Sequence, residues 1–119
     1  MKILIRKITD STPAFEAYIE EKLLPLAKLI KPFEKNGEME IVLDVIRTSN
    51  HHGKGDEIFM AAADVHLPKK AIRAEEYADS MRLAVDRVRD TLKLEIEKYK
   101  TQFMEIDKKK LDKKKEEEL

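Results

Sequence analysis

Hydrophobic and polar residues alternate over three stretches of the chain, which is the pattern of a strand with one buried face. The first stretch, Lys2–Ile8, places Ile3 and Ile5 on the same face. In the second, residues 38–47, the inward positions are Met39, Ile41, Leu43 and Val45. In the third, residues 57–67, they are Phe59, Ala61, Ala63, Val65 and Leu67. A tight turn at 68–70 and a short strand at 71–75 follow, so the pattern predicts four strands.

The other face of the second stretch is less polar than simple alternation requires. We expect Glu40 and Asp44 to point outward there, yet Val42 and Ile46 are apolar and lie on the same face. This mixture predicts that the outer face of the strand is partly covered.

Two further stretches have the three- and four-residue hydrophobic spacing of helices. The first begins at Thr12-Pro13, because threonine is a common N-cap and proline at the first helical position loses no hydrogen bond. Its apolar residues are Phe15, Tyr18, Ile19, Leu23, Leu26 and Ile30. Since Pro25 lies inside this pattern, we expect a kink or a second short turn there. Asn36-Gly37 then ends the helical region.

The second helical stretch begins after Asp79 or Ser80, either of which suits an N-cap. Its apolar residues form one stripe, which comprises Met81, Val85, Val88, Leu92, Ile96, Tyr99, Phe103 and Ile106. Residues 107–119 are almost entirely Lys, Asp and Glu, so we interpret them as a solvated helical extension or a frayed tail.

The order of elements is therefore β-α-β-β-β-α. We predict one α+β domain over residues 1–106, in which a four-stranded sheet carries both helices on one face, and a charged tail at 107–119. The same core occurs in double-stranded RNA-binding domains. The chain has no cysteine, which excludes disulfides and zinc-thiolate sites. Its N-terminal apolar run is too short for a signal peptide or a membrane span, so we expect a cytoplasmic protein without a membrane partner.

The 24 basic and 24 acidic residues give a net charge of zero, which excludes a uniformly basic nucleic-acid binder but not a local basic face. At about 100° per residue, the second helix places four cations on one line beside its apolar stripe, and two on the opposite flank. The line comprises Arg82, Arg89, Lys93 and Lys100, and the flank Arg87 and Lys98. Asp86 falls further round, toward the back.

Lys22 and Lys28 on the first helix extend the same surface if the two helices lie side by side. Two interpretations stay open at this point. The cations form a row that binds a phosphate backbone, or they are ordinary flanking residues whose aliphatic stems cover the edge of the core.

The polar turn between the second and third strands reads TSNHHGKGD over residues 48–56. His51 and His52 can stack on exposed bases, and Lys54 and the neighbouring glycine amides can approach phosphates. Adjacent histidines point in different directions and no cysteine supports them, so we expect no metal. Since no recognisable catalytic or nucleotide-binding motif is present, we expect a binding protein without a cofactor or a small-molecule substrate, not an enzyme.

Several short segments fall in the order found in one bacterial family. They are TPA at 12–14, EKL at 21–23, NHHGKGD at 50–56, RAEE at 73–76 and DSM at 79–81. Over about 1–100 the chain resembles the ribosome hibernation-promoting factors, also known as ribosome-associated inhibitors or sigma-54 modulation proteins. It departs from the family at 82–86, where RLAVD replaces a run that commonly begins with an aromatic residue, and at Leu94-Glu95, which replaces part of a basic run.

The resemblance implies a stress-response protein that binds the small ribosomal subunit in the mRNA and tRNA channel and represses translation by steric occlusion. By similarity, its ribosomal RNA contacts would be Lys22, Lys28, His51, His52, Lys54, Arg82, Arg87, Arg89 and Lys93. The longer family members pair two ribosomes through a second domain, and we expect this chain to act on single ribosomes or to support pairing only indirectly. Two alternatives stay open, namely a double-stranded RNA-binding domain and a protein-interaction regulator that does not bind ribosomes. The first normally places lysines where this chain has Asp79-Ser80.

Overall fold

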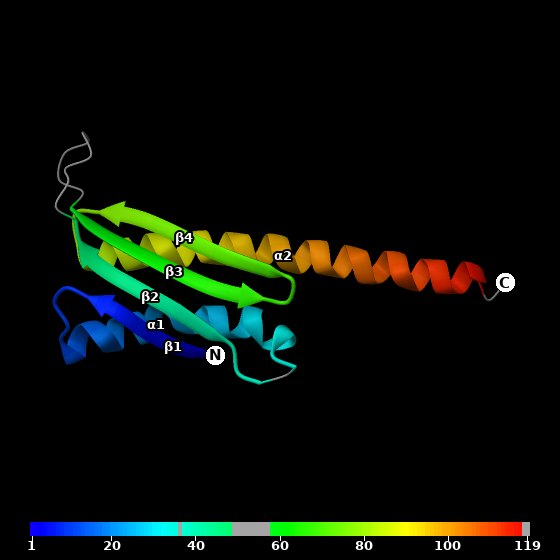
Figure 1. Ribbon diagram of the computed structural model, residues 1–119, viewed down its shortest axis with the longest axis horizontal. Coiled ribbons are helices and arrows are strands. Elements are labelled where there is room, and N and C mark those ends of the chain that lie inside the picture. Colours follow the sequence, from blue (N-terminus) through cyan, green and yellow to red (C-terminus); the bar gives the residue numbers. More distant parts are fainter. Residues whose placement is uncertain (36, 49–57, 118–119) are drawn as a thin grey trace.

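The computed structural model describes residues 1–35, 37–48 and 58–117, with side chains described up to residue 102. A sheet forms one layer and two helices cover one of its faces (Figure 1). The elements are β1 (Lys2–Ile8), α1 (Pro13–Ile30), a short 3-10 turn η1 (Lys31–Phe33), β2 (Glu40–Arg47), β3 (Phe59–Leu67), β4 (Lys70–Ala78) and α2 (Met81–Glu117). The predicted order β-α-β-β-β-α and the α+β class are confirmed.

The four strands follow one another across the sheet in chain order. β1 pairs in parallel with β2, because α1 crosses over between them, whereas β2, β3 and β4 form an antiparallel meander. The register aligns Leu43 with Ala63, and Ala63 with Ala74, so that one inner row consists of a leucine followed by two small alanines. The three strands of the meander therefore present a single apolar face to the helices.

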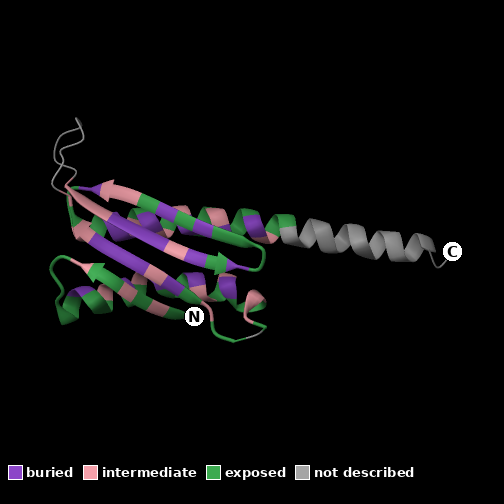
Figure 2. Cartoon of the chain, viewed as in Figure 1, coloured by how far each residue is buried: buried purple, intermediate pink, exposed green. Residues whose placement is uncertain are grey.

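The core lies between that face and the two helices, and Figure 2 shows buried residues concentrated along β2 and β3. The predicted inward residues of both strands are confirmed as buried, apart from Phe59 and Met39, which are partly buried. The helices contribute fully buried side chains from their predicted stripes, among them Ile19, Leu23 and Leu26 from α1 and Val88, Leu92 and Ile96 from α2. Alanines on β3 have little side-chain volume, so α2 packs close to that strand.

Both predicted helix starts are confirmed. The Thr12 hydroxyl accepts a hydrogen bond from the Phe15 N–H at 3.1 Å, with Pro13 at the first helical position. At the second helix it is Ser80, not Asp79, that provides the cap, since its hydroxyl accepts from the Leu83 N–H at 3.2 Å. These caps fix where each helix leaves the sheet.

The bounds of two elements refine the prediction. α1 continues through Pro25 to Ile30, so the second short turn is not found at the proline and a turn follows only at η1, while the alternative of a kink at Pro25 stays a prediction. Pro25 is exposed, so water can satisfy the carbonyl that has lost its N–H partner. β4 is longer than predicted, because it pairs with β3 along its whole length, from Leu67 opposite Lys70 to Phe59 opposite Ala78.

α2 continues to Glu117, well past the end of the sheet (Figure 1). The predicted stripe residues Phe103 and Ile106 lie outside the described side chains, and the domain boundary at 106 stays a prediction. Within the described part of the chain, no helix combines the length and hydrophobicity that a membrane span needs.

Asp44 points outward as predicted, and its burial agrees with the expectation that the outer face of β2 is partly covered. Only 7% of its surface is exposed. Arg6 from β1 covers it with a two-pronged ion pair, in which Nε lies 3.1 Å from Oδ1 and Nη2 lies 2.5 Å from Oδ2. The hydrogen bonds and charge of Arg6 lower the pKa of the Asp44 carboxyl, although burial acts in the opposite direction.

Shortening Leu92 to alanine tests the core. Because the side chain is fully buried, we expect a loss of about 2–5 kcal/mol in the free energy of unfolding. Leu94→Ala is a matched control on the same helix, since Leu94 is 60% exposed, and it should change stability by less than about 0.5 kcal/mol. Urea unfolding measures both; equal effects would contradict the described packing.

Asp44→Asn tests the outer ion pair. The pKa of Asp44 is lower in the folded protein, so the pair stabilises the fold above the unfolded pKa of about 3.9 and the effect is lost as pH falls through the folded value. We expect the variant to lose about 1–3 kcal/mol at neutral pH. The gap in Tm between wild type and variant should shrink below about pH 4. A gap that stays constant down to about pH 2 would contradict a role for the charge.

Candidate nucleic-acid interface

α1 and α2 lie side by side on the same face of the sheet, and Tyr18 joins them. Tyr18 precedes the buried Ile19, so it lies about 100° round α1 from the core and reaches α2 at the edge of the helix layer. Its hydroxyl donates a hydrogen bond to Oδ1 of Asp86 at 2.7 Å. This contact fixes the first turns of the two helices against each other.

Two cations lie against the ring of Tyr18. The guanidinium carbon of Arg82 lies 4.7 Å from the ring centroid, and Nζ of Lys22 lies 5.4 Å from it. Both distances are within the range of a cation–π interaction. The aromatic ring therefore brings together one cation from each helix without supplying a neutralising charge.

The row of cations continues along α2. Arg89 is half-buried and its guanidinium binds Oδ1 of Asp90 at 2.9 and 3.0 Å, while Lys93 is exposed one turn further on. We call Lys22, Arg82, Arg89 and Lys93 the cationic seam. Asp86, Asp90 and Glu97 lie beside these cations on α2, and Arg89 is paired with Asp90. The positive charge of the seam is therefore concentrated where Lys22 and Arg82 meet at Tyr18.

The protonation state of Tyr18 follows from its surroundings. Burial raises the pKa of its hydroxyl, and the hydrogen bond and negative charge of Asp86 act in the same direction, while Arg82 and Arg89 oppose them. The hydroxyl therefore stays protonated at neutral pH and remains a hydrogen-bond donor.

The structure does not bring every predicted site residue to the seam. Arg87 lies on the opposite flank of α2, where its guanidinium donates to the backbone carbonyl of Tyr77 on β4. Lys28 is exposed on α1, nearly three turns after Tyr18 and further from the core. These two residues lie near the seam in sequence but do not line it.

His51, His52 and Lys54 lie outside the described residues. The ends of their loop are described, and the Thr48 N–H donates to the Ile58 carbonyl at 2.6 Å. Phe59 pairs with Ala78, which precedes α2. The loop therefore begins and ends at the same end of the sheet as the start of α2, where Arg82 is found.

Sequence reasoning missed the joining role of Tyr18 and the position of Asp86. Tyr18 packs against the core as its place in the apolar stripe predicts, but its hydroxyl also reaches Asp86, which the spacing places toward the back of α2. One signal was available, since Tyr18 and Lys22 are four residues apart and therefore neighbours on one helix face. The partner of their cluster on α2 depends on helix packing and is not encoded in local spacing.

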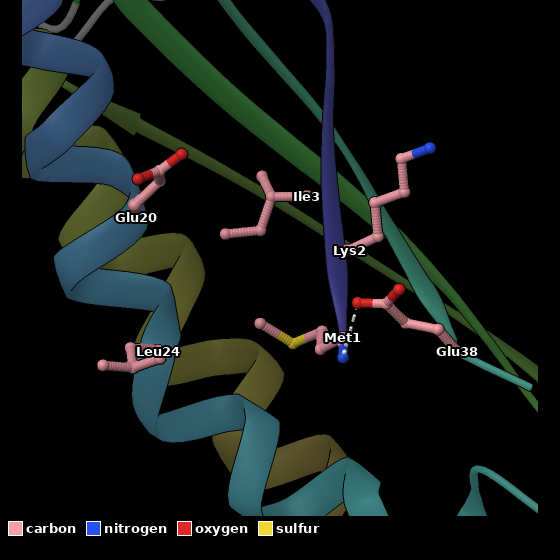
Figure 3. Close-up of a pocket in the computed structure, with 6 residues that line it drawn as sticks. All are labelled: Met1, Lys2, Ile3, Glu20, Leu24 and Glu38. Atoms are coloured by element: carbon pink, nitrogen blue, oxygen red, sulfur yellow. Dashed lines mark ion pairs between the residues drawn. The ribbon is translucent and has the colours of Figure 1, made fainter.

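Figure 3 shows an open pocket between the start of β1 and α1. Its lining residues are Met1, Lys2, Ile3, Glu20, Leu24 and Glu38. The Met1 amino group lies 3.2 Å from the Glu38 carboxylate, so opposite charges are already paired there. Within the described residues, no group of three or more His, Asp or Glu side chains is arranged to hold a metal ion. The seam is therefore the better candidate for a binding surface.

Comparison with solved structures supports the fold. The crystal structure of the Thermus thermophilus Protein Y N-terminal domain is 27% identical, with a TM-score of 0.57, covering 83% of this chain and 99% of that one. A ribosomal subunit interface protein from Coxiella burnetii is 24% identical, with a TM-score of 0.59, covering 85% of this chain and 99% of that one. The similarity to the Coxiella burnetii protein shows a shared fold and nothing further.

Among curated protein sequences, none matches this chain. The family model described as sigma 54 modulation protein / S30EA ribosomal protein matches residues 3–103, which include both helices' described side chains and all four strands. The chain therefore belongs to the sigma 54 modulation protein / S30EA ribosomal protein family.

Proposed function

We propose that this protein binds the small ribosomal subunit in the channel for mRNA and tRNA, and represses translation by occupying that space. Family membership and the solved relatives indicate a ribosome-associated protein of the hibernation and interface class. The subunit, the channel and the contact residues are our proposal. The observation that carries it is the cationic seam on a chain of this family.

The geometry of the seam suits a nucleic-acid backbone. From Arg82 to Arg89 the helix rises about 10 Å, and from Arg89 to Lys93 about 6 Å, so cations recur along one line. RNA carries a regular series of phosphates that such a line can follow. Contacts of this kind position a protein without reading sequence, which fits a factor that blocks a channel.

The outer face of the sheet is a poorer candidate for phosphate binding, because both Arg6 and Arg73 have carboxylate partners there, whereas in the seam only Arg89 is paired with a carboxylate and Arg82 lies over the Tyr18 ring. Arg73 lies 2.7 Å from Asp64 and 3.4 Å from Glu75, and Arg6 is paired with Asp44. A phosphate would have to compete with these ion pairs. We therefore orient the helix layer, not the sheet, toward ribosomal RNA.

The remaining predicted contacts extend this surface. Lys28 would reach RNA that passes over the exposed side of α1, and His51, His52 and Lys54, which lie outside the described residues, are proposed as further RNA contacts. Arg87 would contact a different RNA segment, since it lies on the far flank of α2. The protein would act by steric exclusion and electrostatic attraction and needs no catalytic group.

Charge reversal in the seam tests the site. Arg89→Glu with Lys93→Glu should weaken binding to purified small subunits by at least about tenfold, because two charge-assisted contacts are replaced by repulsion. The measurement is co-sedimentation at matched low salt. Circular dichroism should show a wild-type fold, since neither side chain belongs to the buried core.

Lys69→Glu with Lys70→Glu is the matched control. It makes the same change in net charge at the exposed turn between β3 and β4, and we expect wild-type binding. Unchanged binding by the folded seam variant would remove the seam from the proposal. Equal binding of small subunits and bare RNA duplex would instead favour a double-stranded RNA-binding protein.

Competition tests the channel. At saturation we expect about one copy per small subunit, and initiator tRNA together with a short message should displace the protein because they need the same space. Raising the salt concentration should weaken binding with a linear log–log slope, as it does for phosphate contacts. Simultaneous binding of protein, message and tRNA would contradict occlusion and place the contact elsewhere on the subunit.

A further inference from the structure

We infer that Tyr18 is a positioning residue that keeps Arg82 and Lys22 oriented and charged, so that the two cations form a phosphate-binding site before RNA arrives. This inference rests on the proposed function and assigns a positioning role to one residue of the proposed RNA-binding surface. Its ligand is a backbone phosphate of RNA. The ring of Tyr18 orients the two cations. Its hydroxyl binds Asp86 and so keeps that carboxylate from pairing with a cation.

Asp86 is a carboxylate close enough to the arginines of the seam to reduce its positive charge. It lies four residues after Arg82 and three before Arg89, and side chains at both spacings are neighbours on a helix. An ion pair with Arg82 would neutralise a cation that the seam needs for RNA, whereas Arg89 is already paired with Asp90. In the structure the Asp86 Oδ1 accepts the Tyr18 hydroxyl at 2.7 Å, Arg82 stacks on the ring, and Arg89 binds Asp90. The hydroxyl of Tyr18 therefore competes with Arg82 for Asp86.

The aromatic ring holds the cations in a way that a carboxylate cannot. A carboxylate fixes an arginine but cancels its charge, whereas a ring fixes the guanidinium and leaves the full charge in place. Arg82 is exposed, so its guanidinium is accessible from solvent while it lies over the ring. Restricting Arg82 and Lys22 in advance lowers the side-chain entropy that is lost when a phosphate binds.

Tyr18→Phe separates the two steps, because it removes the hydroxyl and keeps the ring. We expect Asp86 to turn toward Arg82, and affinity for small subunits to fall about 3- to 10-fold, the effect of losing about one charged contact. The slope of log affinity against log salt should become shallower by about one. Asp86→Asn in the same chain removes the competing charge, so the double variant should return to within about twofold of wild type.

The rescue distinguishes positioning from a structural role. If the hydroxyl served only to hold α1 against α2, the double variant would remain as weak as Tyr18→Phe, and the inference would be overturned. Tyr99→Phe is the matched control, since the Tyr99 hydroxyl donates to the Pro68 carbonyl at 2.6 Å at a different place in the fold. We expect it to leave affinity and salt slope unchanged.

A measurement on the free protein separates this inference from the proposed function. The Arg82 Nε–H resonance in an NMR spectrum reports whether the guanidinium lies on the ring or pairs with a carboxylate. We expect it to shift in Tyr18→Phe and to return toward the wild-type position when Asp86→Asn is added. An unmoved resonance overturns the inference even if the wild type binds ribosomes. A shift and return in a protein that fails to bind small subunits supports the positioning step and contradicts the proposed function.

Discussion

The parallel, side-by-side packing of α1 and α2 on one face of the sheet is the constraint from which the other features follow. The apolar face of β2 and β3 is wide enough to need both helices, and each helix buries one stripe against it. Once both stripes are buried, one flank of α1 necessarily faces one flank of α2. The residues on those flanks, not the buried ones, define the surface that the protein offers to a partner.

The seam shows how a chain without net charge acquires a basic surface. Cations and carboxylates are equally abundant in the sequence, but they are distributed differently over the fold. On the outer face of the sheet, Arg6 and Arg73 bind carboxylates on neighbouring strands or on their own, so little field extends into solvent. Between the helices an aromatic ring takes the place of a carboxylate as the neighbour of two cations, and the positive charge persists.

Most of the fold could be predicted from local patterns, because its elements are regular and their signals agree. Alternation identified β1, β2 and β3, and hydroxyl residues marked both helix starts. The features that local patterns left open share one physical origin. The full length of β4, the continuation of α1 past Pro25 and the extent to which Asp44 is buried are set by pairing and packing partners that are distant in sequence. For the same reason the line of cations on α2 was visible in the sequence, but its cross-helix contact with Tyr18 was not.

The parallel pairing of β1 with β2 has a consequence for how the chain folds. Residues that meet in this pair are far apart in sequence, as Arg6 and Asp44 are at 38 positions, whereas β3 and β4 are joined by a two-residue turn. Closing the long loop costs more chain entropy than closing the hairpin. The meander of β2, β3 and β4 is therefore expected to form first, and β1 to join a sheet edge that already exists. Although β1 precedes the other three strands of the sheet in the chain, it is thus expected to be the last of them to pair, and the seam is complete only after α1, which follows β1, has docked.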